Sequence, residues 1–138
     1  ELGKRRQASD IEKRLNLNSA ISIYNYMYPK VQDKDIEEAW ILLLNQKLDL
    51  IEAKCISHGG ITGTAIDIRI ILKEALLRNA TAIALCHNHP SGNPRPSRED
   101  DNITNSLKKA ADTMHIYFID HVIVAQQHFY SYREEGKI

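Results

Sequence analysis

The fold and the candidate site both centre on one stretch, Ala80-Thr-Ala-Ile-Ala-Leu-Cys-His-Asn-His-Pro-Ser-Gly-Asn-Pro-Arg-Pro-Ser-Arg-Glu-Asp100. It begins with small and apolar residues only, which is typical of a strand buried on both faces. His87 and His89 follow where that strand is expected to end, the usual place for functional residues in open α/β sheets. In an extended backbone, residues i and i+2 point to the same side. The two imidazoles can therefore converge on one ion, while Asn88 points away.

A carboxylate completes a metal-ligand set. Asp100 lies eleven residues after His89, and the prolines between them restrict the loop, so that it loses less entropy on closing. Two neutral nitrogens and one carboxylate make three protein ligands, the number of a catalytic rather than a structural zinc site. We therefore predict one Zn²⁺ held by His87, His89 and Asp100. The fourth position would belong to a water, and a glutamate would act as general acid and base.

Simpler interpretations of the same residues exist. Ser97-Arg-Glu-Asp100 matches a capping box, so Ser97 and Asp100 could merely begin a helix, although Ser97 could cap a helix and still face a metal. Metal-free packing has no need for two histidines on one side of a strand end. The remaining histidines are interpreted as ordinary solvated or packed residues: His58, His115, His121 and His128.

Hydrophobic periodicity predicts the rest of the fold. We expect helices over residues 10–15 (capped by Ser9), 19–27, 65–79 and 97–114, and strands over residues 38–45, 48–57, 80–86, 116–125 and 129–133. This order is typical of an α/β domain, a three-layer α/β/α sandwich with a mixed sheet. Residues 1–9 are interpreted as a tail or linker and residues 10–138 as a single domain.

Composition excludes several classes of protein. Eighteen basic residues balance eighteen acidic ones, which argues against a protein that grips nucleic acid mainly by neutralising phosphates. The longest apolar run, residues 39–44, is far shorter than the ~20 residues that cross a bilayer. Two cysteines provide no disulfide framework, so a reduced, cytoplasmic setting is expected.

The string His87-Asn-His-Pro-Ser-Gly, followed by Pro-Ser97-Arg-Glu-Asp100, closely resembles the RadC family, a branch of the JAB/MPN+ (JAMM) metalloprotease-like domains. The shared pattern is His-x-His-Pro, a short spacer and Ser-x-x-Asp, preceded by a distant glutamate. The resemblance covers about residues 1–138 and includes Leu2-Gly-Lys-Arg-Arg6, Gly59-Gly60, Lys73-Glu-Ala-Leu76 and Asp120-His121.

The resemblance implies a cytidine-deaminase-like α/β/α sandwich with zinc held by the two histidines and the aspartate. It also implies that Ser97 helps to hold the water or the developing oxyanion. The family's glutamate opens the first core strand as Glu-x-aromatic, which Glu38-Ala-Trp40 matches, so we predict Glu38 as general acid and base. Glu37 is adjacent but would point to the opposite face of a strand. Glu52, on the next strand, ranks lowest.

These expectations favour a zinc-dependent peptidase or isopeptidase whose substrate is a protein or peptide. The alternatives are a DNA-repair-associated accessory or nuclease-like factor of the RadC family, and a binding module without turnover. Family members usually carry an N-terminal helical domain suited to DNA, and this chain starts where that domain would have ended. DNA association is therefore expected only through such a domain. An exposed edge strand is expected at the C-terminal pair, and related domains often dimerise or bind extended peptides along an edge, so a homodimer is a candidate assembly whose surface the sequence does not locate.

Overall fold

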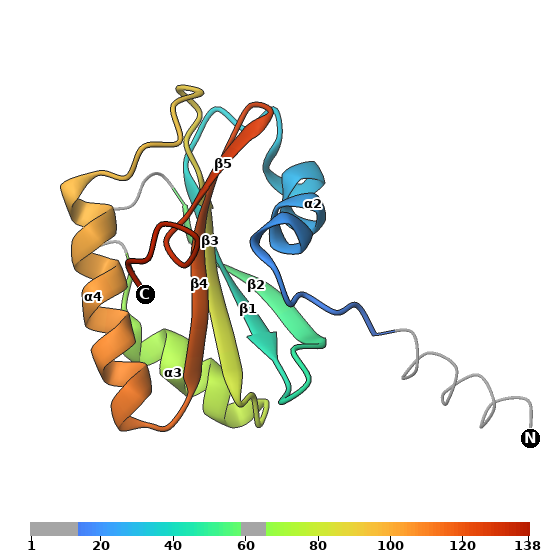
Figure 1. The fold of residues 1–138 in the computed structure, drawn as a ribbon, viewed down its shortest axis with the longest axis vertical. Helices are drawn as coiled ribbons and strands as arrows, with labels where there is room; N and C mark the ends of the chain where they lie inside the picture. The colour runs from blue at the N-terminus through green and yellow to red at the C-terminus, as the bar shows by residue number, and fades with distance from the viewer. Residues whose placement is uncertain (1–13, 59–65) are drawn as a thin grey trace, which may run out of the picture.

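A mixed five-stranded sheet with helices on both faces forms the domain (Figure 1), and the computed structural model describes residues 14–58 and 66–138 of it. The described elements are α2 (Ala20–Val31), β1 (Glu38–Leu44), β2 (Leu50–His58), α3 (Ile68–Leu77), β3 (Ala82–Asn88), α4 (Arg98–Thr113), β4 (Tyr117–Ala125) and β5 (His128–Ser131). The strand order is β2-β1-β3-β4-β5. Strands β3 and β4 run parallel, and the other neighbouring strands run antiparallel.

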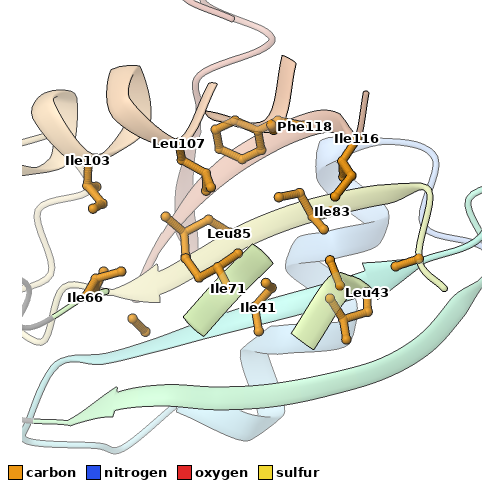
Figure 2. Close-up of a cluster of buried hydrophobic side chains, with 14 residues drawn as sticks. Ile41, Leu43, Ile66, Ile71, Ile83, Leu85, Ile103, Leu107, Ile116 and Phe118 are labelled. Atoms are coloured by element: carbon orange, nitrogen blue, oxygen red, sulfur yellow. The ribbon is translucent and has the colours of Figure 1, made fainter. Parts of the chain in front are cut away.

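Each face of the sheet carries its own hydrophobic core. Alternate residues of β1 and β3 point to opposite faces. Ile41 and Leu85 belong to the core under α3 and α4, which Figure 2 shows. Leu42 and Ala84 belong to the core under α2, which lies on the other side of the sheet (Figure 1). Both faces are covered, and this is why β1 and β3 are apolar runs without alternation. The arrangement confirms the predicted α/β/α sandwich.

Two predicted boundaries are wrong, and the first is the end of α2. The helix does not stop before Pro29 but continues around it to Val31. Proline lacks an N–H and so removes one hydrogen bond from the last turn. Met27 and Val31 are both buried and hold that turn against the sheet, and the Gln32 N–H closes it by donating to the Tyr28 carbonyl at 2.8 Å.

The second is the end of β3, which was expected at Cys86 and lies at Asn88. The strand is central and pairs on both sides: His87 is opposite Ala39 of β1, and Asn88 is opposite Val124 of β4. These two ladders carry the strand two residues further than its apolar run. His87 is therefore a strand residue and not, as expected, the start of a loop.

The other described elements differ from their predicted bounds by at most three residues. The tail at 1–9, its Ser9 cap, residues 10–13 of the first predicted helix and the Gly59-Gly60 turn lie outside the described residues. Arg14 and Leu15, which are described, are not helical. Within residues 14–58 and 66–138, no helix is long and apolar enough to cross a membrane.

Candidate metal centre

The three predicted metal ligands meet at the end of β3 and the start of α4. His87 Nε2 lies 2.9 Å from His89 Nε2. Asp100 Oδ1 lies 3.2 Å from His87 Nε2, and Asp100 Oδ2 lies 3.2 Å from His89 Nε2. Each residue offers a ligand atom within 4.8 Å of the other two. His87 and Asp100 are buried, whereas His89 is partly exposed. The geometry is that of a small ligand set with one side open to solvent.

A capping box aims the Asp100 carboxylate. Ser97 is the N-cap of α4, and its Oγ accepts a hydrogen bond from the Asp100 N–H at 3.1 Å. Asp100 Oδ2 in turn accepts from the Ser97 N–H at 2.8 Å. The helix start predicted from Ser97-Arg-Glu-Asp100 therefore exists, and it fixes the side chain that the metal interpretation needs. The two interpretations describe one structure, because the same capping contacts orient the carboxylate toward His87 and His89.

The structure adds a buried histidine that the sequence interpretation passed over. His121 Nε2 lies 2.7 Å from His87 Nδ1, on the far side of that ring from Asp100. His121 Nδ1 lies 2.5 Å from Thr104 Oγ1, and Thr104 Oγ1 donates to the main-chain carbonyl of Asp100 at 2.7 Å. Tyr132 stacks on the His121 ring with centroids 4.8 Å apart and planes 7° from parallel. His121 was interpreted as an ordinary residue, but it contacts a candidate ligand directly.

A β-bulge explains how His121 reaches the site. In the β3–β4 ladder, Ile83 is opposite Phe118 and Ala84 is opposite Asp120, so Ile119 is an extra residue. The bulge shifts the alternation of β4, and bulges often re-aim side chains beside functional sites in this way. His121 therefore faces the α4 side of the sheet, as Phe118 does three residues earlier. The sequence gives two indications of a role: Asp120-His121 interrupts an otherwise apolar strand, and it is part of the resemblance to the RadC family.

The three histidines of the site differ in the direction in which their surroundings shift the pKa. Burial lowers the pKa of His87, and burial together with the neighbouring His87 ring lowers the pKa of His121 well below its ordinary value. Burial also acts to lower the pKa of His89, but the Asp100 carboxylate and the Asn93 carbonyl outweigh it and raise that pKa. Burial acts to raise the pKa of Asp100, but His87 and His89 reverse this and hold it below its usual range. At neutral pH the centre therefore holds a carboxylate beside neutral His87 and His121.

The structure does not bring Glu38 to these ligands. The Glu38 N–H donates to Asn88 Oδ1 at 2.7 Å, and Trp40 Nε1 donates to Glu38 Oε1 at 3.1 Å. Trp40 packs against the core on the α2 side of the sheet. His87 and its partner Ala39 face the opposite side, so Glu38 is on the wrong face for the predicted role.

Glu37 has an electrostatic effect on two of the candidate ligands. Its negative charge acts to raise the pKa of His87 and of His89, although burial lowers the pKa of His87 overall. This effect favours Glu37 over Glu38 as the glutamate that acts on the site, whereas the sequence favoured Glu38. The third alternative, Glu52, forms an ion pair with Arg78 at 3.2 Å and does not join the site.

A cleft of about 870 Å³ opens beside the ligands. The loop after α2, the residues that follow β3, and the β4–β5 turn form its walls. His89 lines it directly, together with Lys34, Asn88 and Gln127. Of the three candidate ligands, His89 alone lines this cleft, whose other walls lie on the α2 side of the sheet.

Comparison with known proteins places the chain in a family. Residues 17–137 match the model of the RadC-like JAB domain. A UPF0758 protein of Flavobacterium johnsoniae is 38% identical over 136 residues, which cover 99% of this chain and 59% of that protein. A UPF0758 protein of Symbiobacterium thermophilum is 37% identical, with 98% and 57% covered. The chain thus spans about three fifths of the length of these curated relatives. The resemblance to RadC is confirmed: this chain belongs to the family of RadC-like JAB domains.

Proposed function

We propose that the chain binds one Zn²⁺ through His87, His89 and Asp100 and hydrolyses peptide or isopeptide bonds. One observation supports the metal site: acceptor atoms of the three side chains lie close together with no hydrogen-bond donor between them. His89 Nδ1 lies 2.8 Å from the Asn93 carbonyl, which can only accept, so Nδ1 carries a proton and Nε2 of the neutral ring is bare. Asp100 Oδ1 is buried and lies 3.2 Å from His87 Nε2, and it has no hydrogen-bond partner among the residues that the structure describes. A bound cation would stabilise these acceptor atoms, which otherwise face one another.

The donor set favours zinc over harder cations. Two imidazole nitrogens and one carboxylate suit Zn²⁺, whereas Mg²⁺ and Ca²⁺ prefer oxygen ligands alone. Zinc bound there would supply Lewis-acid chemistry, lowering the pKa of a bound water to about 7 and polarising a carbonyl. The partly exposed His89 leaves one side of the ligand set open, where a water and the substrate would approach.

The remaining chemistry falls to Glu37 and Ser97. Glu37 is close enough to act on the pKa of both histidines, and we assign it to take the proton of the attacking water and deliver it to the leaving amine. Ser97 Oγ accepts from the Asp100 N–H, and its own hydroxyl proton is then available for the developing oxyanion.

The metal claim is tested by elemental analysis and zinc titration of the purified chain. We expect about one zinc per chain in the wild type and none in the His87→Ala variant. A wild-type chain that takes up no zinc at neutral pH would contradict the proposal. The readout does not depend on knowing the substrate.

The hydrolytic claim is tested with a peptide mixture and lysine isopeptide conjugates, analysed by mass spectrometry for new termini. The adjacent glutamates Glu37 and Glu38 provide a matched pair of variants. We expect Glu37→Gln to keep its zinc and lose roughly 10²–10⁴-fold in rate, and Glu38→Gln to stay near the wild type. Equal rates for the two variants would remove Glu37 from the mechanism. Cleavage of branched DNA that survives Glu37→Gln would point to a different site.

A further inference from the structure

We propose that His121 and Thr104 set the tautomer of His87, so that its Nε2 is bare and ready to bind the metal. The inference rests on the proposed metal site and assigns positioning roles to two residues outside the ligand set. The relay, as we call it, runs from His87 of β3 to His121 of β4, then to Thr104 of α4 and the main-chain carbonyl of Asp100. It begins at one proposed ligand and ends at another.

The direction of every hydrogen bond in the relay follows from its last member. A carbonyl oxygen can only accept, so the Thr104 hydroxyl donates its one proton to the Asp100 carbonyl, at 2.7 Å. Thr104 Oγ1 must therefore accept from His121 Nδ1, at 2.5 Å. His121 carries its proton on Nδ1, and its Nε2 is left as an acceptor. That acceptor lies 2.7 Å from His87 Nδ1, which must be the donor.

Neutrality of both rings completes the argument. His87 and His121 have no exposed surface, and Thr104 has 1%. Burial penalises the charged form of an imidazole. A neutral imidazole has one N–H. With that proton on Nδ1, His87 presents a bare Nε2 toward Asp100.

The relay gives His87 Nδ1 a hydrogen-bond acceptor, as the Asn93 carbonyl does for His89 Nδ1. His89 lies in a loop, where its Nδ1 reaches the Asn93 carbonyl directly. His87 lies within β3, between two strands whose ladders occupy the neighbouring main-chain groups. The acceptor for His87 Nδ1 must therefore be a side chain of a neighbouring strand. The bulge at Ile119 turns the side chain of His121, on β4, toward His87.

Further contacts hold His121 in place. Tyr132 stacks on the ring, and the Tyr132 hydroxyl donates to Asp101 Oδ1 of α4 at 2.7 Å. Thr104 is one turn after Asp100 on the same helix, so the relay joins the strand that carries His87 to the helix that carries Asp100. Such outer contacts of metal-binding histidines commonly change metal affinity by 10–100-fold when they are removed.

The first test is nitrogen-15 NMR of the metal-free wild type at pH 8, which reports the proton position on each histidine ring. We expect the proton of His87 on Nδ1 and that of His121 on Nδ1. A His87 ring with its proton on Nε2 would overturn the proposal, and no substitution is needed for this result. A wild-type chain with the expected tautomers that nevertheless takes up no zinc would overturn the metal site and leave the hydrogen-bond order standing.

The second test compares Thr104→Val with Thr104→Ser. Valine matches the shape of threonine but has no hydroxyl, so His121 loses its acceptor and can turn its proton toward His87. We expect zinc to bind roughly 10–100-fold more weakly to Thr104→Val, with the His87 proton moved to Nε2 in the metal-free protein. Thr104→Ser keeps the hydroxyl and should restore both readouts to near the wild-type values. Equal zinc affinities for the two variants would overturn the relay.

Discussion

At the scale of single residues, the cluster of His87, His89 and Asp100 could be predicted, whereas its contacts with neighbouring side chains could not. His87 and His89 are two apart in an extended segment, and Asp100 is fixed by a local cap, so short-range rules suffice for all three. Glu37 and Glu38 are adjacent, and an error of one residue exchanges the two faces of a strand. His121 depends on a bulge in the pairing of β4 with β3, which hydrophobic periodicity does not encode.

The two cysteines should differ sharply in reactivity. Cys86 has no exposed surface, and burial raises the pKa of its thiol far above the ordinary value. Cys55 is only partly buried, and burial raises its pKa too, although a backbone hydrogen bond with Ser57 opposes this. Only a thiolate in contact with solvent reacts. We therefore expect iodoacetamide at pH 8 to modify Cys55 at least about 100-fold faster than Cys86, because Cys86 becomes accessible only when the protein unfolds.

Peptide mapping over time, with and without urea, measures both rates. In urea the two cysteines should react at similar rates, which serves as the internal control. Comparable rates in the folded protein would show that β3 opens far more readily than its burial implies.

At the scale of elements, the ends were harder to predict than the elements themselves. Each described helix and strand follows from apolar periodicity, but the end of a strand depends on partners distant in the sequence. Asn88 belongs to β3 because Val124 pairs with it, and α2 passes Pro29 because Val31 is buried. Such ends are set by tertiary packing, which local propensity cannot report.

The N-terminus of α4 provides a test at this scale. Ser97→Ala removes the oxygen that accepts from the Asp100 N–H. We expect it to lower the free energy of unfolding by about 1 kcal/mol, within the 0.5–2 kcal/mol range for lost N-caps. The variant should also bind zinc more weakly, because the cap orients the Asp100 carboxylate.

Urea denaturation of the metal-free protein measures the stability term. Ser106→Ala, an exposed serine farther along the same helix, is the matched control and should be neutral or slightly stabilising because alanine favours helices. If Ser97→Ala matches Ser106→Ala in both stability and zinc affinity, the capping box does not hold the ligand.

At the scale of the whole molecule, stability and the candidate site meet at β3. This strand is central in the sheet, lies between both cores and is buried along its whole length. The edge strands β2 and β5 pair on one side only. We therefore expect the amides of β3 to exchange with deuterium only through global unfolding, and those of β2 and β5 to exchange faster through local opening.

Zinc should slow the exchange of β3 further, because a ligand that binds only the folded state stabilises it by mass action. At a free zinc concentration of 100 times Kd this amounts to about 2.7 kcal/mol, or ~100-fold slower exchange wherever opening is global. His87→Ala should abolish the zinc effect while keeping β3 the slowest strand. Exchange in β3 as fast as in β2 would contradict a centre at the core of the fold. Since the ligands His87 and Asp100 join β3 to α4, a zinc effect confined to the loop at His89 would argue that only part of the ligand set binds the ion.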